Sequence, residues 1–349
     1  MRLPRRRALL LAMVAILASA SAIAGVQSTP PRLPQRLESY LSNVVRLSTG
    51  ERKLLINGSP VSKLLDADAS KEVAVFGAVW IDGPVRRYVD LVKDIQRFER
   101  GGGFRVTRRI SSPPRLEDFS DLRLSSDEVN DLRSCRVGDC EIKLGQRALD
   151  AMRREVDWNS AGAHAAAETV MRRLAHEYVI GYLEGGNDRL AVYRDSSRPT
   201  FVAEEFRSMV DRMPELTAYM PNLRRYLLEY PNVTLPDATS FLYWQETEFG
   251  LKPTIRISHL TIREGPDDTV VASKMLYASH YFWSALELRA LVPDPARGSG
   301  FWFVTVSRSL SDGLSGFTGL FVRRRVQSEA RAGALAAVRL TKRMVEQGR

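Results

Sequence analysis

The sequence predicts an α+β protein in which an antiparallel sheet is followed by a long C-terminal helix. Strand-like segments follow one another after residue 240 with short turns between them, which favours an antiparallel meander. After Asp312-Gly313, small and apolar residues recur at helical spacing to about Glu346, which predicts one long helix. The stretch from about 146 to 230 is rich in helical patterns bounded by prolines, so we expect a helical insertion there.

The N-terminus has the pattern of a secretory signal peptide over residues 1–24. Arg2 and Arg5-Arg6-Arg7 precede an apolar run over 8–17, and small residues with A-x-A spacing follow. We therefore expect an exported protein, in the periplasm or outside the cell. The apolar run is shorter than the ~20 residues of a membrane-spanning helix. An uncleaved N-terminal anchor is the alternative.

The charge pattern argues against nucleic acid as a partner. Removing the signal lowers the net charge from +10 to +6, because it carries four arginines and no acidic residue. The remaining basic residues are mostly interspersed with acids, without the aromatic-lined basic stripe of a nucleic-acid surface. The run Arg323-Arg324-Arg325 is either a solvated helix face or a peripheral contact with an anionic membrane.

Cys135 and Cys140 are the only cysteines and lie on either side of Gly138-Asp139. In an oxidising compartment this spacing predicts a local disulfide across a tight turn. The pair does not match the C-x-x-C redox motif, and a zinc site would need two further ligands. We therefore expect neither a metal site nor a cofactor.

The first part of the chain alternates between loop and regular structure. Residues 25–70 are predicted to form an N-terminal leader with one short helix near 35–47, followed by loop at Gly50, Gly58 and Pro60. The β-branched and aromatic run at 72–81 predicts a strand, and Pro84 then starts an amphipathic helix that reaches about Phe98. Further strands are expected at Phe104–Ile110 and within Leu116–Leu124.

The same patterns assign the remaining elements. Helices are expected at Gln146–Trp158, Ala161–Leu183, Phe201–Met213 and Leu216–Tyr230, with a short strand near Arg189–Tyr193. Strands are expected at Ser240–Phe249, Thr254–Glu264, Val270–Val292 and Gly300–Leu310. The third of these exceeds a normal strand length, so we expect it to bend or bulge midway.

This order of elements resembles the helix-grip fold of the START/SRPBCC-like superfamily. The resemblance rests on residues 73–85 and 275–345, and the segments KMLYASHYFWSALELRALV and FWFVTVSRSLSDG are similar to secreted bacterial members of uncertain function. It implies a curved antiparallel sheet that wraps the long C-terminal helix, with a cavity between them for lipids or other hydrophobic molecules. The START-like domain would span 71–349, with the helical insertion at about 146–230.

His280 is the strongest single site candidate. Strand alternation from Leu286 and Leu288 places it with Phe282 on the apolar side, facing the core or a cavity. A buried imidazole needs a hydrogen-bonding partner, so His280 is either structural or orients a ligand or a proton. The other candidate ligand-binding residues are large aromatic side chains of the sheet and small residues of the last helix, namely Trp244, Trp302, Ala334 and Ala337.

No catalytic motif is complete in this sequence. His176-Glu177 lacks the second histidine of H-E-x-x-H, and the segment from Gly313 to Gly316 falls short of G-x-S-x-G. The leading hypothesis is therefore an exported protein that binds a hydrophobic or amphipathic small molecule, such as an envelope lipid. His280 or a strand carboxylate, Glu246 or Glu248, would orient the polar end. One alternative is a cyclase- or hydrolase-type enzyme that uses His280, and another is an envelope interaction protein without a small ligand.

Overall fold

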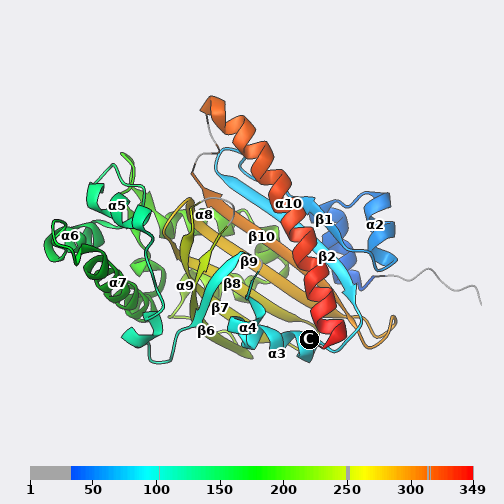
Figure 1. Cartoon of the computed structure of the whole chain (residues 1–349). Helices are drawn as coiled ribbons and strands as arrows, with labels where there is room; N and C mark the ends of the chain where they lie inside the picture. The colour runs from blue at the N-terminus through cyan, green and yellow to red at the C-terminus, as the bar shows by residue number, and fades with distance from the viewer. Residues whose placement is uncertain (1–32, 102, 249–251, 313, 315, 349) are drawn as a thin grey trace, which may run out of the picture. The chain divides into compact units, whose positions relative to one another are not determined.

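An eight-stranded antiparallel sheet organises the structure, with strand order β1-β2-β10-β9-β8-β7-β6-β3 (Figure 1). The computed structural model describes residues 33–348 apart from 102, 249–251, 313 and 315, and residues from Leu33 onward form one compact unit. The predicted signal peptide lies outside the described residues. The chain is thus α+β, as predicted, with a large antiparallel sheet and a C-terminal helix.

The strands of this sheet match most of the predicted segments. They are β1 Val61–Leu64, β2 Glu72–Ile81, β3 Phe104–Arg109, β6 Ala238–Thr247, β7 Thr254–Glu264, β8 Thr269–Ala278, β9 Phe282–Pro293 and β10 Phe301–Ser311. A separate hairpin pairs β4 Val192–Tyr193 with β5 Thr200–Phe201.

One segment that was predicted as a single strand is divided in the structure. Residues 270–292 do not form a single bent strand but two paired strands, β8 and β9, joined by a turn at Ser279–Tyr281. Tyr281 takes the left-handed conformation, with φ of 59°, in place of the glycine or asparagine that usually marks such a turn. The turn therefore carries no sequence signal, and His280 lies in the turn rather than along a strand.

The first half of the chain contains two further departures. Leu116–Leu124 holds no strand, because its first part is the short 3₁₀ helix η2 Leu116–Phe119. The predicted loop after residue 47 contains a helix, α2 Thr49–Ile56, and strand β1. The start of α2 has a recognisable signal, since Ser48 and Glu51 form a reciprocal capping box.

The other regular elements of the described chain are helices. They are α1 Gln35–Tyr40, η1 Leu41–Val45, α3 Val85–Lys93, α4 Ile95–Phe98, α5 Ser126–Ser134, α6 Gln146–Glu155, α7 Ala163–Gly185, η3 Gly186–Arg189, α8 Val202–Asp211, η4 Glu215–Tyr219, α9 Pro221–Glu229 and α10 Gly316–Gln347. Within the described residues, none of them combines the length and apolarity required to cross a bilayer.

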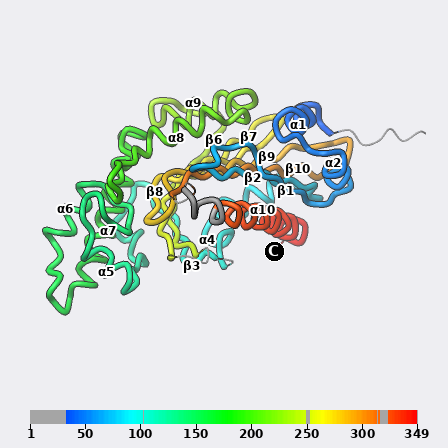
Figure 2. Tube along the Cα trace, turned by 90° about the horizontal axis from the view of Figure 1, so that it is seen from above, coloured from blue at the N-terminus to red at the C-terminus, as the bar shows by residue number. Residues whose placement is uncertain are grey.

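The two faces of the sheet bury different sets of helices. Figure 2 shows α8 and α9 on one side of the strands and α10 with α4 on the other. On the α10 face, α3 and α4 complete an apolar cluster with Val79, Leu260, Leu291 and Phe303. On the opposite face, α1 and α2 cover β2 and β10, α8 and α9 cover β8 to β10, and α7 packs over β6 and β7.

The predicted disulfide between Cys135 and Cys140 is confirmed. Cys135 directly follows α5, and the backbone of Arg136 pairs with that of Asp139 to form the turn. Backbone hydrogen bonds from Gly138 and Cys140 to Arg194 and Asp195 attach this loop to the β4–β5 hairpin. The disulfide therefore stabilises the local connection between α5 and the β4–β5 hairpin.

Helix α10 crosses β1 and β2 and approaches the sheet most closely at Gly77 of β2 (Figure 1). A Cβ atom on Gly77 would lie 2.7 Å from Cγ2 of Val338 and 3.1 Å from Cγ2 of Thr305. Near its C-terminal end the helix is held by the Lys342 ammonium, which donates to the carbonyl of Trp80 at 2.7 Å. The lack of a side chain at Gly77 thus allows α10 to lie close to β2.

Replacing Gly77 with valine should lower the free energy of unfolding by about 1–3 kcal/mol, because the added side chain overpacks the contact with Val338. Urea denaturation followed by tryptophan fluorescence measures this. Gly50→Ala in α2 is the control, since its Cβ would meet no atom within 4 Å. Equal stability of Gly77→Val and wild type would contradict the close contact.

Candidate ligand-binding site beneath the C-terminal helix

A cavity of about 250 Å³ lies between α10 and the sheet. Its volume corresponds to roughly eight water molecules at ~30 Å³ each, enough for a small organic molecule. The upper wall comes from α10 and the floor from β6 to β10, with α4 and the start of β3 at one side. The residues that line it include Phe98, Glu99, Phe104, Tyr243, Gln245, Arg256, Ser273, Ala285, Glu287, Arg289, Phe303, Thr305, Ser307, Ala337, Val338, Leu340, Thr341 and Met344.

Strand register explains why the floor of this cavity is polar. On β9, Glu287 and Arg289 are two residues apart and therefore point to the same face. Glu287 lies between Ser307 of β10 and Ser273 of β8, while Arg289 lies beside Thr305. The intervening Leu286 and Leu288 pack on the opposite face, against α8 and α9.

An ion-pair cluster forms the deepest part of the floor. The Arg289 guanidinium donates two hydrogen bonds to the Glu287 carboxylate, at 2.8 and 2.7 Å, and lies 3.7 Å from Glu99. Glu99 also accepts a hydrogen bond from the Gln245 amide at 2.7 Å. Arg289 and Glu99 are each 8% exposed, so this pairing is shielded from water.

Burial separates the proton affinities of the two carboxylates. It raises the pKa of Glu99, and the attraction of Arg289 only partly offsets this. Burial also opposes ionisation of Glu287, but the charge and hydrogen bonds of Arg289 hold the pKa of Glu287 below its usual range. Arg289 is therefore neutralised chiefly by Glu287.

Arg256 of β7 lines the same cavity and has no such partner. It is half-buried, and its guanidinium makes no hydrogen bond or ion pair within 4 Å with any described residue, although its charge helps to lower the pKa values of Glu99 and Glu287 across the cavity. Its Nε is buried without an acceptor, and so is Nη1 of Arg289. Buried guanidinium donors without partners are costly, so the cavity favours a guest that brings oxygen acceptors.

The predicted site residues do not come together in this cavity. Ala337 lines it, whereas Ala334 lies one turn earlier, with its carbonyl oxygen near Gly77. Trp244 and Trp302 are on the opposite face, each about 1% exposed. Their indole nitrogens donate to the Asp118 carbonyl and the Asp294 carboxylate, at 2.8 and 3.0 Å.

His280 and Phe282 are at the β8–β9 turn and do not line this cavity. The His280 ring is 2% exposed; its Nδ1 is 2.9 Å from the carbonyl oxygen of Glu141, and its Nε2 is 3.7 Å from the Glu128 carboxylate. His280 lines neither this cavity nor the pocket of the helical region described below. Its contacts connect the turn to α5 and the disulfide loop.

The other candidates also have partners within the protein. Glu246 accepts from Arg105 at 2.9 Å, and Glu248 lies 3.6 Å from the same arginine. Of the basic run on α10, Arg323 donates to the carbonyl of Ala69, and Arg325 pairs with Glu329. In the part of the chain that the structure describes, no three His, Cys, Asp or Glu side chains are grouped to hold a metal ion.

A second buried polar centre joins the helical region to the sheet. The Lys274 ammonium of β8 donates to the side chain of Asn187 and to the carbonyl of Leu227, and its nitrogen is 4.4 Å from the centre of the Phe206 ring. The Tyr182 hydroxyl is 2.9 Å from Nδ1 of His259. Burial lowers the pKa of Lys274 to about 7, and burial together with the Lys274 charge lowers that of His259 to about 3.

The residues that sequence analysis missed were Glu99, Arg256, Glu287 and Arg289. A signal was present in the strands, because charged residues alternate with Leu286, Leu288, Ile255 and Ile257 in segments otherwise typical of a core. Charges at such positions indicate a polar inner face. Their convergence with Glu99 depends on the strand order, which the sequence does not reveal.

Comparison with known proteins adds no identity: no protein-family model matches the chain, and a search of curated proteins finds no significant match.

The buried ammonium of Lys274 makes stability depend on pH. The pKa of Lys274 is about 7 in the folded protein and 10.5 in the unfolded chain, so the unfolded chain takes up a proton first as the pH falls. The free energy of unfolding is therefore highest above pH 10.5 and decreases until the pH reaches about 7. Relative to Lys274→Met, the wild type should lose on the order of 5 kcal/mol between pH 10.5 and about 7, at ~1.4 kcal/mol for each of about 3.5 pKa units.

Urea denaturation at about pH 7, 8 and 9 tests this dependence. The exposed Lys53 provides the control, since Lys53→Met should keep the wild-type slope. Parallel pH profiles for wild type and Lys274→Met would show that the buried ammonium does not control stability.

Proposed function

We propose that the chain is an exported binding protein for an amphipathic small molecule with an acidic head, held between the sheet and α10. The mixed fold, the strand order and the C-terminal helix support the helix-grip resemblance to START/SRPBCC-like proteins. In this proposal α10 closes the cavity over the sheet, and envelope lipids or their acidic fragments are the natural class of ligand.

The observation that carries this proposal is the unpaired guanidinium of Arg256 inside a partly apolar cavity. A carboxylate or phosphate oxygen would accept the hydrogen bonds that no described side chain accepts. The apolar remainder of the guest would lie against Phe98, Phe303 and Val338. Such a division between a few polar groups and apolar walls is typical of small-molecule sites.

The two alternatives have less support. An enzyme that uses His280 would need space for a substrate beside the imidazole, but the ring is packed against the backbone of Glu141 and the Glu128 side chain. An interaction protein without a small ligand would be favoured by a filled interior beneath α10, whereas about 250 Å³ is open there.

Calorimetric titration with decanoate and with decanol tests the role of Arg256. We expect decanoate to bind more tightly than decanol, because only the carboxylate pairs with the guanidinium. Arg256→Met should weaken decanoate by roughly 10- to 100-fold and leave decanol nearly unchanged.

Arg207→Met is the matched control, since Arg207 is an exposed arginine of α8 on the other face of the sheet. Equal affinity of the wild type for both compounds would reject the acidic head. Equal loss in both arginine variants would reject the assignment to this cavity.

A further inference from the structure

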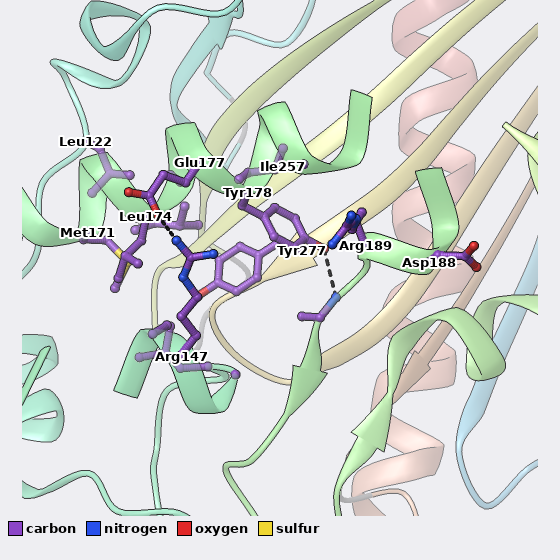
Figure 3. A pocket seen from close by; sticks show the side chains of 17 residues that line it. Leu122, Arg147, Met171, Leu174, Glu177, Tyr178, Asp188, Arg189, Ile257 and Tyr277 are labelled. Atoms are coloured by element: carbon purple, nitrogen blue, oxygen red, sulfur yellow. Dashed lines mark hydrogen bonds and ion pairs between the residues drawn. The ribbon is translucent and has the colours of Figure 1, made fainter. Parts of the chain in front are cut away.

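A larger pocket, of about 390 Å³, lies in the helical region on the opposite face of the sheet. We call it the insertion pocket; it is formed by α6, α7, the loops around β4, and strands β7 and β8. Figure 3 shows Leu122, Met171 and Leu174 on one side and Arg189 and Asp188 toward the other. Strands β7 and β8 separate it from the cavity beneath α10, and the two sites share no lining residue, so this site does not rest on the function proposed above.

The interior of the insertion pocket is apolar and aromatic. Side chains of Met171, Leu174, Ile255 and Ile257 line it together with the rings of two tyrosines. The one buried polar atom without a partner among these described side chains is the Tyr277 hydroxyl, to which a guest could offer a single uncharged hydrogen-bonding group. Tyr178 and Tyr277 meet edge to face, with ring centres 6.0 Å apart. Such an arrangement favours a flat apolar guest that can extend the aromatic packing.

The polar end of Tyr178 is already occupied by the protein backbone. Its hydroxyl donates to the carbonyl of Leu276 at 2.6 Å and accepts from the amide of Ala191 at 3.3 Å. These bonds hold the ring in position without leaving a charged group in the pocket. The tyrosine therefore offers its apolar ring to a guest.

The charges at the rim balance. Arg147 pairs with Glu177 at 3.1 Å on one side (Figure 3), and Arg189 and Asp188 supply one charge of each sign on the other. The pocket thus carries no net charge with which to select an anion or a cation. The cavity beneath α10 also balances formally, with Arg256 and Arg289 against Glu99 and Glu287, so the two sites differ in the half-buried guanidinium of Arg256 rather than in net charge. The balanced rim of the insertion pocket favours an uncharged guest.

Gly181 leaves part of the pocket open on the side of α7. It lies in the interior of the 23-residue helix α7, where glycine is among the least favourable residues. It also lines the insertion pocket, and a Cβ atom there would meet nothing within 4 Å. Packing within the described protein therefore does not require a glycine, whereas a guest in the pocket would use the space.

We propose that the insertion pocket binds an uncharged, ring-containing apolar molecule. Removal of its apolar surface from water supplies the affinity, and Tyr178 and Tyr277 orient the ring. The size of the pocket is within the range of ligand sites for small organic molecules. The protein then carries two separate sites of different chemistry on the two faces of one sheet.

The test uses N-phenyl-1-naphthylamine, an uncharged aromatic probe whose fluorescence rises in apolar surroundings, with the full chain. We expect saturable binding to the wild type and at least a tenfold loss of affinity in Gly181→Leu, whose side chain fills the pocket. Gly333→Leu is the matched control: Gly333 is an exposed helical glycine of α10 with the same open surroundings, and its replacement should leave binding unchanged.

Three outcomes would overturn the proposal: no saturable binding to the wild type, equal affinity of Gly181→Leu and Gly333→Leu, or loss of the probe in Arg256→Met, which would assign it to the cavity beneath α10. Thermal melting confirms that each variant is folded. If Gly181→Leu does not fold, Ala148→Leu replaces it, because its side chain fills the pocket from α6. The same loss of probe affinity is then expected.

Discussion

The approach of α10 to β2 at Gly77 is the constraint on which the proposed ligand-binding site depends. Val338 lies so near this glycine that a side chain there would have to displace Val338 or Thr305. The Lys342 ammonium holds the same helix to the carbonyl of Trp80. Beyond Val338 the helix follows β2 to its end, where Val345 lies beside Gly83 and Glu346 accepts a hydrogen bond from the amide of Asp82. One side of these turns forms the roof of the cavity above the polar floor.

The polar floor gives this cavity its chemical character. A sheet face buried under a helix is normally apolar, and charged groups there are retained only when they are paired. The Glu287 carboxylate accepts two hydrogen bonds from the Arg289 guanidinium, and the Gln245 amide donates one to Glu99. Arg256 is the exception, since no described side chain pairs with it. In the proposal, an acidic guest completes this arrangement, whereas a wholly apolar one leaves the buried Nε of Arg256 without an acceptor.

Local patterns predicted much of the fold but little of the site. The strand at 72–81, the strand at 254–264 and the last helix were predicted within a few residues, because their composition and periodicity are strong over ten residues or more. The hairpin at His280 was missed because its turn has no glycine, proline or asparagine. That error also placed His280 on a strand face, although it lies in a turn and contacts α5.

The site itself could not be predicted because its members are far apart in the sequence. Glu99 follows α4, Arg256 is on β7, and Arg289 is on β9, so their meeting depends on strand order and register. Ala337 was chosen for its small size, and that reasoning holds only where the helix has a space beneath it. The two tryptophans were chosen for their aromatic character, but they are buried on the opposite face of the sheet.

Native mass spectrometry of the full chain, purified from the envelope fraction of its own host, tests the central claim most directly. Wild type and Ala285→Leu, which fills the cavity beneath α10 from the sheet floor, would be compared for retained small molecules. The account predicts an acidic amphipathic adduct on the wild type and its loss from a folded Ala285→Leu. A wild-type chain without an adduct, or an adduct retained equally by both proteins, would contradict it.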